Sequence, residues 1–212
     1  MRITKIERQK KRPSRASVFI DDAFAFGIGV EVLTRLSLHV GAELNKEMID
    51  MILLTEDEEG AKQKALRFLA IRPRSIKEMR DYLLRKEFSA PIVANVIAKL
   101  ESLKMLDDLS FARMVCRDAI AEKPVGEKLL RQGLFRKGLP KEITEEVIGE
   151  FITPESELSQ ALIAAEKYRE RVSRSSKKIE DARMKQKILE FLMRRGFDFE
   201  TAMSATKQIF TK

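Results

Sequence analysis

The side chains in this sequence that are best placed to do chemistry are cations that recur at fixed positions. Three segments align without gaps on one apolar residue, here called the anchor, which is Phe88, Leu139 and Phe197. Four cations precede the anchor at equal offsets in the first two segments, namely Lys77, Arg80, Arg85 and Lys86, and then Lys128, Arg131, Arg136 and Lys137. Side chains of this kind are suited to binding phosphate or carboxylate groups.

This basic pattern has two interpretations. Cations in the last turn of a helix interact favourably with the helix dipole, by about 0.3–1 kcal/mol each, which accounts for the last pair in each segment. The dipole does not account for Lys77, Arg80, Lys128 and Arg131, which lie one and two turns earlier on one side of the expected helix. A stripe that binds a partner and a merely solvated helix face both remain open.

Further cations flank the repeated segments. They are Arg72 and Arg74 before the first anchor, and Arg171, Arg174, Lys177 and Lys178 in a serine-containing stretch before the third. We expect residues 171–178 to form a loop between helices, where the charges bind phosphate or remain hydrated. The basic stretch from Arg8 to Arg15 is also expected to be a loop.

No set of residues in the sequence converges on catalysis, a cofactor or a metal ion. His39 is the only histidine and Cys116 the only cysteine, and the two lie far apart in sequence. The carboxylates of residues 56–59 are consecutive on an expected helix and therefore spread around it. We predict that the protein is not an enzyme and has no cofactor and no metal site.

Composition narrows the class of protein further. The chain has 212 residues, of which 44% are hydrophobic and 35% charged, and a formal net charge of +8. These proportions exclude wholesale disorder, and no apolar run is long enough to span a membrane. The positive net charge favours polyanionic partners. A single cysteine cannot form a disulfide within the chain, which is typical of proteins in the reducing cytoplasm. We expect a cytoplasmic monomer that does not contact membranes.

The first residues differ from the rest in their hydrophobic pattern. The apolar runs 18–20 and 23–26 flank Asp21 and Asp22, which predicts a small β-hairpin with a two-residue turn. Residues 2–6 alternate polar and apolar side chains and could add a third strand. A short helix is expected over residues 31–38, followed by a long helix from Asn45 to about Arg72.

The rest of the sequence repeats a pattern of apolar residues. Nine positions before the anchor stand Met79, Leu130 and Ile188, and eight positions after it stand Val96, Val147 and Ala205. These offsets correspond to helical periods on either side of a turn, so each unit is predicted to contain three helices.

Turn and cap residues mark the same division. Gly138 and Gly196 stand where a helix ends in the left-handed conformation, whereas the first unit has Glu87 there. Ser75 and Glu78 form a predicted capping box, and Asp107 or Asp108 is predicted to cap the helix that contains Phe111.

The predicted fold is therefore mainly α. We expect a β-hairpin module with a short helix over residues 1–44, and three-helix repeats over residues 45–106, 107–152 and 153–212. Stacked units of this kind form an elongated, curved array.

Several motifs resemble those of the RecX family of bacterial regulators of the RecA recombinase. Residues 18–27 are similar to the family's N-terminal hairpin, and residues 72–79 look like its first-repeat signature. Residues 105–112, with Asp107, Asp108 and Phe111, resemble its Asp-Asp motif, and residues 126–139 resemble the second-repeat pattern that begins at Gly126 and ends after Gly138. The sequence departs from the family at Met105, where an aromatic residue is usual, and at Glu87, where glycine is usual.

The resemblance implies a regulator without enzymatic activity that lies in the groove of the RecA filament on single-stranded DNA. There it would inhibit ATP hydrolysis, strand exchange and coprotease activity. The alternative from the residues alone is a regulator that binds single- or double-stranded DNA directly through the basic helices of the repeats.

Overall fold

The computed structural model describes residues 1–175 and 180–211, apart from the side chain of Ser175, and these residues are mostly helical. The chain divides into two compact units. The first comprises Met1–Arg72 and Met79–Leu103, and the second comprises Pro73–Glu78 and Lys104–Lys212. No helix in the described ranges is long and apolar enough to cross a membrane.

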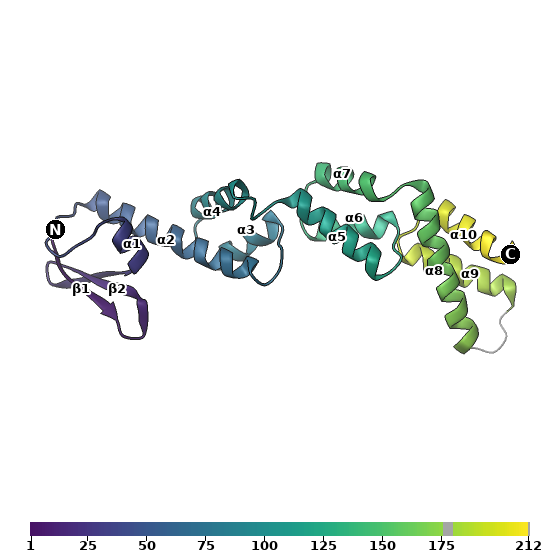
Figure 1. Ribbon diagram of the computed structural model, residues 1–212, viewed down its shortest axis with the longest axis horizontal. Helices are drawn as coiled ribbons and strands as arrows, with labels where there is room; N and C mark the ends of the chain where they lie inside the picture. The colour runs from purple at the N-terminus through teal and green to yellow at the C-terminus, as the bar shows by residue number, and fades with distance from the viewer. Residues whose placement is uncertain (176–179, 212) are drawn as a thin grey trace. The chain divides into compact units, whose positions relative to one another are not determined.

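The first unit begins with a three-stranded antiparallel sheet (Figure 1), in the order β1 (Ile3–Gln9), β2 (Arg12–Ile20) and β3 (Ala23–Gly29). The predicted hairpin is confirmed, because β2 and β3 meet at Asp21 and Asp22, both of which have positive φ angles. One face of the sheet buries Ile3, Val18 and Ile28 against α1 (Val30–Arg35) and the start of α2 (Lys46–Leu69). This burial fixes the sheet against α2.

The prediction of a basic loop over Arg8 to Arg15 is wrong. Arg8 pairs with Ala16 and Gln9 pairs with Arg12, so the stretch forms the ends of β1 and β2 with a turn at residues 10–11. An antiparallel sheet can expose one face to water, and long cations on that face do not prevent pairing. The many cations of residues 8–15 are typical of a loop, so the sequence alone did not indicate strands there.

The helices of the first repeat are α2, α3 (Ile76–Leu84) and α4 (Ala90–Ser102). Asn45 caps α2 by accepting a hydrogen bond from the N–H of Met48 at 2.8 Å. The helix ends at Leu69, close to the predicted end. Within the first unit, the rings of Phe68 and Tyr82 stack with their centroids 4.0 Å apart, which holds α2 against α3.

The second unit contains the second and third repeats, with six helices in the described residues. They are α5 (Asp108–Glu122), α6 (Glu127–Arg136), α7 (Lys141–Phe151), α8 (Pro154–Ser175), α9 (Asp181–Arg194) and α10 (Phe199–Thr211). The positions predicted to be apolar are buried, as Leu130 and Val147 show in the second repeat and Ile188 and Ala205 in the third. The prediction of tandem three-helix repeats is confirmed.

The loop expected over residues 171–178 begins too early. The helix α8 continues to Ser175, so Arg171 and Arg174 are helical. Arginine is a good helix former, and the neighbouring Val172 is packed against the buried residues of the third repeat. Lys177 and Lys178 lie outside the described residues.

The middle helix of each repeat ends in the same way. Glu87, Gly138 and Gly196 all adopt positive φ angles, of 66°, 74° and 88°. Each precedes the anchor, whose N–H donates to the carbonyl five residues earlier, at Leu83, Leu134 and Leu192. The three segments therefore share backbone geometry, and Glu87 takes a conformation that favours glycine.

Candidate partner-binding surface

The predicted motif at Ser75 and Glu78 begins α3. The N–H of Glu78 donates to the Ser75 hydroxyl at 3.1 Å, and the N–H of Ser75 donates to the Glu78 carboxylate at 3.4 Å. This is the reciprocal capping box that the spacing predicts.

The same end of α3 contacts the second repeat, within the second unit. The N–H of Ile76 donates to the Asp108 carboxylate at 2.8 Å, and the Ser75 hydroxyl donates to the Lys137 carbonyl at 2.7 Å. Gly138 lies against the stem of Lys77, because a Cβ at Gly138 would collide with that side chain. We call this cluster, made of Ser75, Ile76, Asp108, Lys137 and Gly138, the first joint.

An equivalent cluster connects the second repeat to the third. The N–H of Glu127, at the start of α6, donates to the Glu157 carboxylate at 3.0 Å. The N–H of Gly126 donates to the Arg195 carbonyl at 2.9 Å, and a Cβ on Gly126 would collide with the backbone at Gly196. These five residues form the second joint, and all of them except Glu157 stand at the same offsets from the anchors as their counterparts in the first.

The two aspartates of the predicted cap therefore have different roles. Asp107 caps α5, since its carboxylate accepts from the N–H groups of Leu109 and Ser110 at 3.0 and 3.1 Å. These bonds, chiefly that of Ser110, lower the pKa of Asp107. Asp108 belongs to the first joint, and Phe111 is buried in the core of the second repeat.

The repeated cations lie in several different environments. Arg131 is held by Glu127 and by Glu145, whose carboxylate is 2.7 Å from the guanidinium, and the bond to Glu127 is the main cause of its raised pKa. Lys137 lies 3.6 Å from Glu78. Lys128 is exposed. Arg131 and Lys137 thus have acidic partners within the chain, so the stripe is not a uniform row of open charges.

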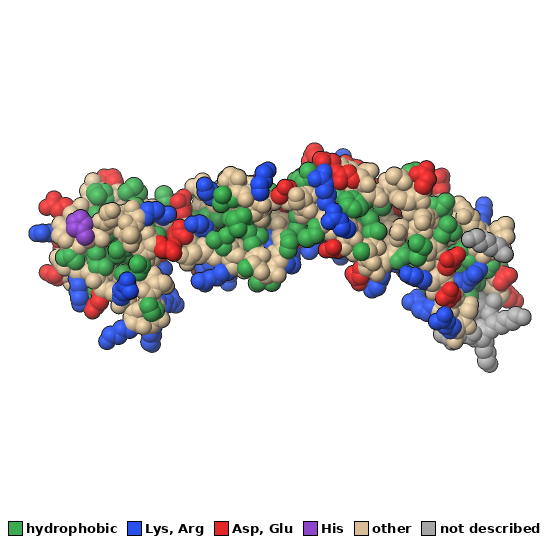
Figure 2. Space-filling model, in the orientation of Figure 1, with side chains coloured by type: hydrophobic (Ala, Val, Ile, Leu, Met, Phe, Trp, Pro, Cys, Tyr) green, Lys and Arg blue, Asp and Glu red, His purple; other side chains and the backbone are tan. Residues whose placement is uncertain are grey.

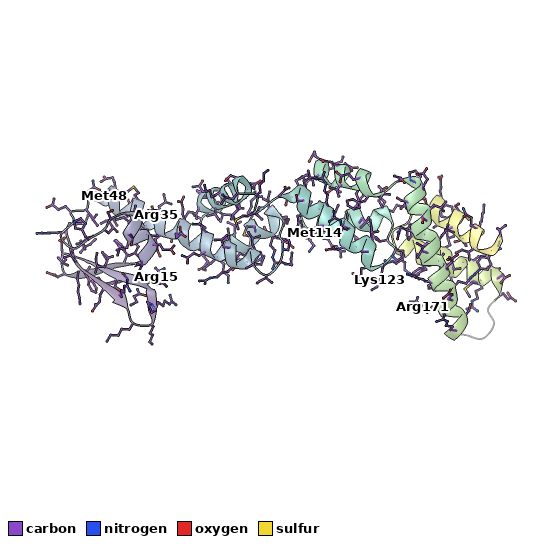
Figure 3. All side chains as sticks on the ribbon, in the orientation of Figure 1. Arg15, Arg35, Met48, Met114, Lys123 and Arg171 are labelled. Carbon is purple, nitrogen blue, oxygen red and sulfur yellow. The ribbon has the colours of Figure 1, made fainter. Side chains whose placement is uncertain are left out.

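The remaining predicted partner-binding residues differ in exposure and in their neighbours. Arg72, Arg80 and Arg136 are exposed, while Arg74 is half-buried. Arg171 lies near the C-terminal end of α8 (Figure 3). Its guanidinium lies over the ring of Tyr168 at 5.1 Å, and Arg174 pairs with Glu170 at 3.5 Å. A role in binding for any of these residues stays a prediction.

A second recurring feature was missed in the sequence. Four positions before the anchor stand Leu84, Phe135 and Met193, whose side chains are 44%, 78% and 48% exposed. An exposed arginine follows each of them, as Arg85, Arg136 and Arg194. Figure 2 shows hydrophobic side chains on the surface beside cations. We call these three dipeptides the exposed pairs.

The sequence did contain a signal for the exposed pairs. The leucine directly before each pair, at Leu83, Leu134 and Leu192, is fully buried. Adjacent residues of a helix point in different directions, so two consecutive apolar residues near a helix end cannot both face a narrow core.

The cysteine thiol and the candidate metal ligands lie in the described residues. The Cys116 thiol lies in the core of the second repeat, and burial raises its pKa to about 11. Residues 1–175 and 180–211 contain no cluster of three histidine, cysteine or acidic side chains that could hold a metal ion.

Comparison with known proteins identifies the family. The model of the regulatory protein RecX N-terminal domain matches residues 1–45, and the models of the first, second and third RecX three-helix domains match residues 61–100, 107–148 and 155–206.

Two relatives and one solved structure resemble the chain over nearly its whole length. The regulatory protein RecX of Listeria monocytogenes serotype 4a (strain HCC23) is 33% identical over 98% of this chain and 76% of the relative. That of Bacillus subtilis (strain 168) is 34% identical, with the same coverage. A crystal structure of regulatory protein RecX aligns with a TM-score of 0.74 and 26% identity, covering 100% of this chain and 99% of the other. This chain therefore belongs to the RecX family of regulatory proteins.

Proposed function

We propose that the chain regulates the RecA recombinase by binding the filament that RecA forms on single-stranded DNA. In this proposal it inhibits the ATPase, strand-exchange and coprotease activities of the filament and has no catalytic activity of its own. It acts as a monomer in the cytoplasm. Membership of a family whose relatives are named regulatory proteins supports the proposal.

The observation that carries the proposal is the recurrence of the exposed pairs. Each pair stands at the same offset from the anchor, at the C-terminal end of the middle helix of its repeat. A large apolar side chain in water gains about 1.5–3 kcal/mol when a partner buries it fully. A surface that recurs along a chain suits a partner whose own subunits recur, as those of a filament do.

The arginine of each exposed pair adds charge to the apolar contact. Arginine can bind a carboxylate of a protein or a phosphate of DNA through two parallel hydrogen bonds. The helix dipole alone would explain a cation at this position. It does not explain why an exposed apolar residue precedes that cation in all three repeats.

A binding experiment tests the proposal. The labelled chain is titrated with RecA assembled on oligothymidylate in the presence of a non-hydrolysable ATP analogue, and with the same oligothymidylate and a DNA duplex alone. We expect binding to the filament to be at least about tenfold tighter than to either DNA at moderate salt, a difference of ~1.4 kcal/mol.

The same titration can reject the proposal. Equal affinity for the filament and for naked DNA would assign the chain to the alternative class, a regulator that binds DNA directly through the basic helices of its repeats.

A further inference from the structure

A cleft in the first unit lies between the sheet and α2. It has a volume of about 560 Å³. Its walls come from the end of β1, the start of β2, the end of β3, the start of α1, and α2 from Glu56 to Arg67. Because the buried face of the sheet is packed against the start of α2, the two walls belong to one folded body. The cleft is separate from the exposed pairs and from both joints.

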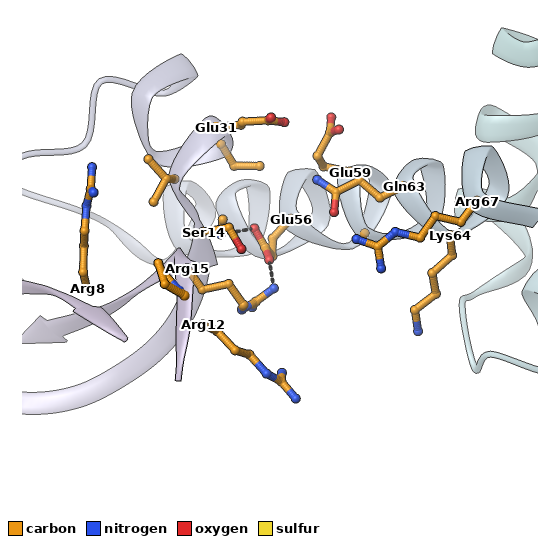
Figure 4. A pocket seen from close by; sticks show the side chains of 15 residues that line it. Arg8, Arg12, Ser14, Arg15, Glu31, Glu56, Glu59, Gln63, Lys64 and Arg67 are labelled. Carbon is orange, nitrogen blue, oxygen red and sulfur yellow. Dashed lines mark hydrogen bonds and ion pairs between the residues drawn. The ribbon is translucent and has the colours of Figure 1, made fainter. Parts of the chain in front are cut away.

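Five cations line this cleft. They are Arg8, Arg12 and Arg15 from the sheet, and Lys64 and Arg67 from α2. Figure 4 shows Arg12 reaching out from β2, and Lys64 and Arg67 reaching out from α2, on the same side of the helix. In Figure 2, cations also gather around the β1–β2 hairpin beside the cleft.

The carboxylates that line the cleft are largely engaged by other groups. Glu56 accepts a hydrogen bond from the N–H of Gly29 at 2.7 Å and pairs with Arg15 at 2.6 Å. Glu59 pairs with Arg35 at 3.5 Å and with Lys62 at 3.3 Å. The third carboxylate, that of Glu31, is exposed on the rim.

Four cations of the cleft are therefore left to meet a ligand. In the described part of the chain, Arg8, Arg12, Lys64 and Arg67 have no carboxylate within ion-pair distance, and Lys64 lies 5.0 Å over the ring of Phe88. Four like charges around one opening produce a positive potential, which attracts an anion with several charges. A ligand with a single charge would leave most of them unneutralised.

The lining has the side chains that a phosphodiester chain requires. Arg12 and Arg67 present planar guanidinium groups, which match the tetrahedral oxygens of phosphate, and Ser14 and Gln63 add neutral polar groups between them. No aromatic side chain lines the cleft, so it offers no surface on which a base or a nucleotide could stack. A strand held here would be bound by its backbone.

We propose that the cleft between β2 and α2 binds the phosphate backbone of single-stranded nucleic acid through Arg8, Arg12, Lys64 and Arg67. This site does not require the recombinase, so it stands independently of the proposed function. In a regulator of a filament on DNA, it would hold the strand while the repeats contact protein.

The test measures binding of the full chain to labelled oligothymidylate of roughly 20 nucleotides, longer than the ~4–16 covered by a typical single-strand binding module, without recombinase. Fluorescence anisotropy is recorded at several salt concentrations for the wild type and for Arg12→Ala/Arg67→Ala. The control is Arg117→Ala/Lys141→Ala, which removes two exposed cations from the second unit and changes the net charge equally.

The cleft variant should bind at least about tenfold more weakly, because two phosphate contacts are lost. The slope of log affinity against log salt should flatten by about 1.4, since each contact to a single strand contributes about 0.7. The control should bind within about twofold of the wild type. Arg12→Gln/Arg67→Gln, which keeps polar side chains of intermediate length, should reproduce the loss if the alanine variant is poorly folded.

Three results would overturn the proposal. The first is equal weakening in the cleft variant and the control, which would indicate attraction by net charge alone. The second is absence of binding by the wild type at low salt. The third is displacement of the strand by polyglutamate at the same concentration of charge, which would assign the cleft to an acidic peptide. If the chain still inhibits the recombinase when any of these results is obtained, the proposed nucleic-acid site is rejected and the proposed function is not.

Discussion

The Asp108 carboxylate accepts a hydrogen bond at 2.8 Å from the N–H of Ile76, a residue 32 positions earlier in the chain. Glu157 accepts from the N–H of Glu127 at 3.0 Å in the same way. In both cases an acidic residue near the start of one repeat caps a helix of the preceding repeat. The capped end is the N-terminus of that repeat's middle helix. The same kind of helix capping therefore occurs in both joints.

Loss of the Asp108 carboxylate should destabilise the second unit. In Asp108→Ala the half-buried N–H of Ile76 loses its acceptor, which costs about 1–3 kcal/mol. Asp108→Asn keeps an oxygen acceptor and should cost less. Urea denaturation measures both variants, with Asp118→Ala as the control because Asp118 is an exposed residue of the same helix. If Asp108→Ala is as stable as that control, the hydrogen bond does not contribute as described.

Asp107 should contribute stability that depends on pH. Its pKa is lowered in the folded state, mainly by the N–H of Ser110, from an ordinary value of 3.8. The contribution is therefore complete above about pH 3.8 and is lost as the pH falls through the lower folded pKa. We expect Asp107→Ala to cost ~0.5–2 kcal/mol at neutral pH and less in acid. A cost that is the same at both pH values would contradict this account.

Glu157 should show the opposite dependence. Burial is the main cause of its raised pKa, with an ordinary value of 4.5, so folding favours the protonated carboxyl. The stability of the wild type should fall as the pH rises from 4.5 through the higher folded pKa. Glu157→Gln retains an acceptor for Glu127 without ionising. The melting temperature of Glu157→Gln minus that of the wild type should therefore increase as the pH rises above 4.5. A difference in melting temperature that does not depend on pH would reject the argument.

The turn after α3 offers a stabilising substitution. Glu87 has a φ angle of 66°, which costs a residue with a side chain about 1–2 kcal/mol, whereas glycine gains freedom in the unfolded chain worth roughly 0.5–1 kcal/mol. Glu87→Gly should therefore raise the free energy of unfolding by about 0.5–1 kcal/mol. The converse change, Gly138→Ala, should destabilise the protein, because it adds collision with Lys77 to the same strain. Thermal melts of both variants check the prediction, and a loss of stability in Glu87→Gly would contradict it.

Features that depend on neighbouring residues could be predicted from the sequence. The capping box at Ser75 and Glu78 and the turns at Gly138 and Gly196 involve hydrogen bonds over a few positions, so spacing and residue type suffice to indicate them. The repeat alignment also predicted the buried residues, because equal offsets on a helix lie on equal faces. The proposed domain boundaries and the curvature of the array stay predictions.

Features that depend on distant residues could not be predicted. Nothing local distinguishes Asp108, which caps a helix in another repeat, from Asp107, which caps its own. The ion pair between Arg131 and Glu145 likewise requires α6 and α7 to be packed together. The exposure of Phe135 depends on where the core ends, and the cleft beside Arg12 depends on how the sheet lies against α2.

Inhibition of the DNA-dependent ATPase of RecA tests the central claim most directly. The triple variant Leu84→Ala/Phe135→Ala/Met193→Ala removes the apolar residue of each exposed pair. Because these side chains are exposed, each change should alter stability by less than about 0.5 kcal/mol. The control is Met105→Ala/Ile163→Ala/Phe199→Ala, which removes three side chains that are also exposed but do not recur at an equivalent position.

We predict that the triple variant inhibits RecA at least about tenfold less potently than the wild type, a loss of ~1.4 kcal/mol, while the control stays within about twofold. Inhibition by the triple variant at wild-type potency would contradict the claim that the recurring exposed pairs bind the filament.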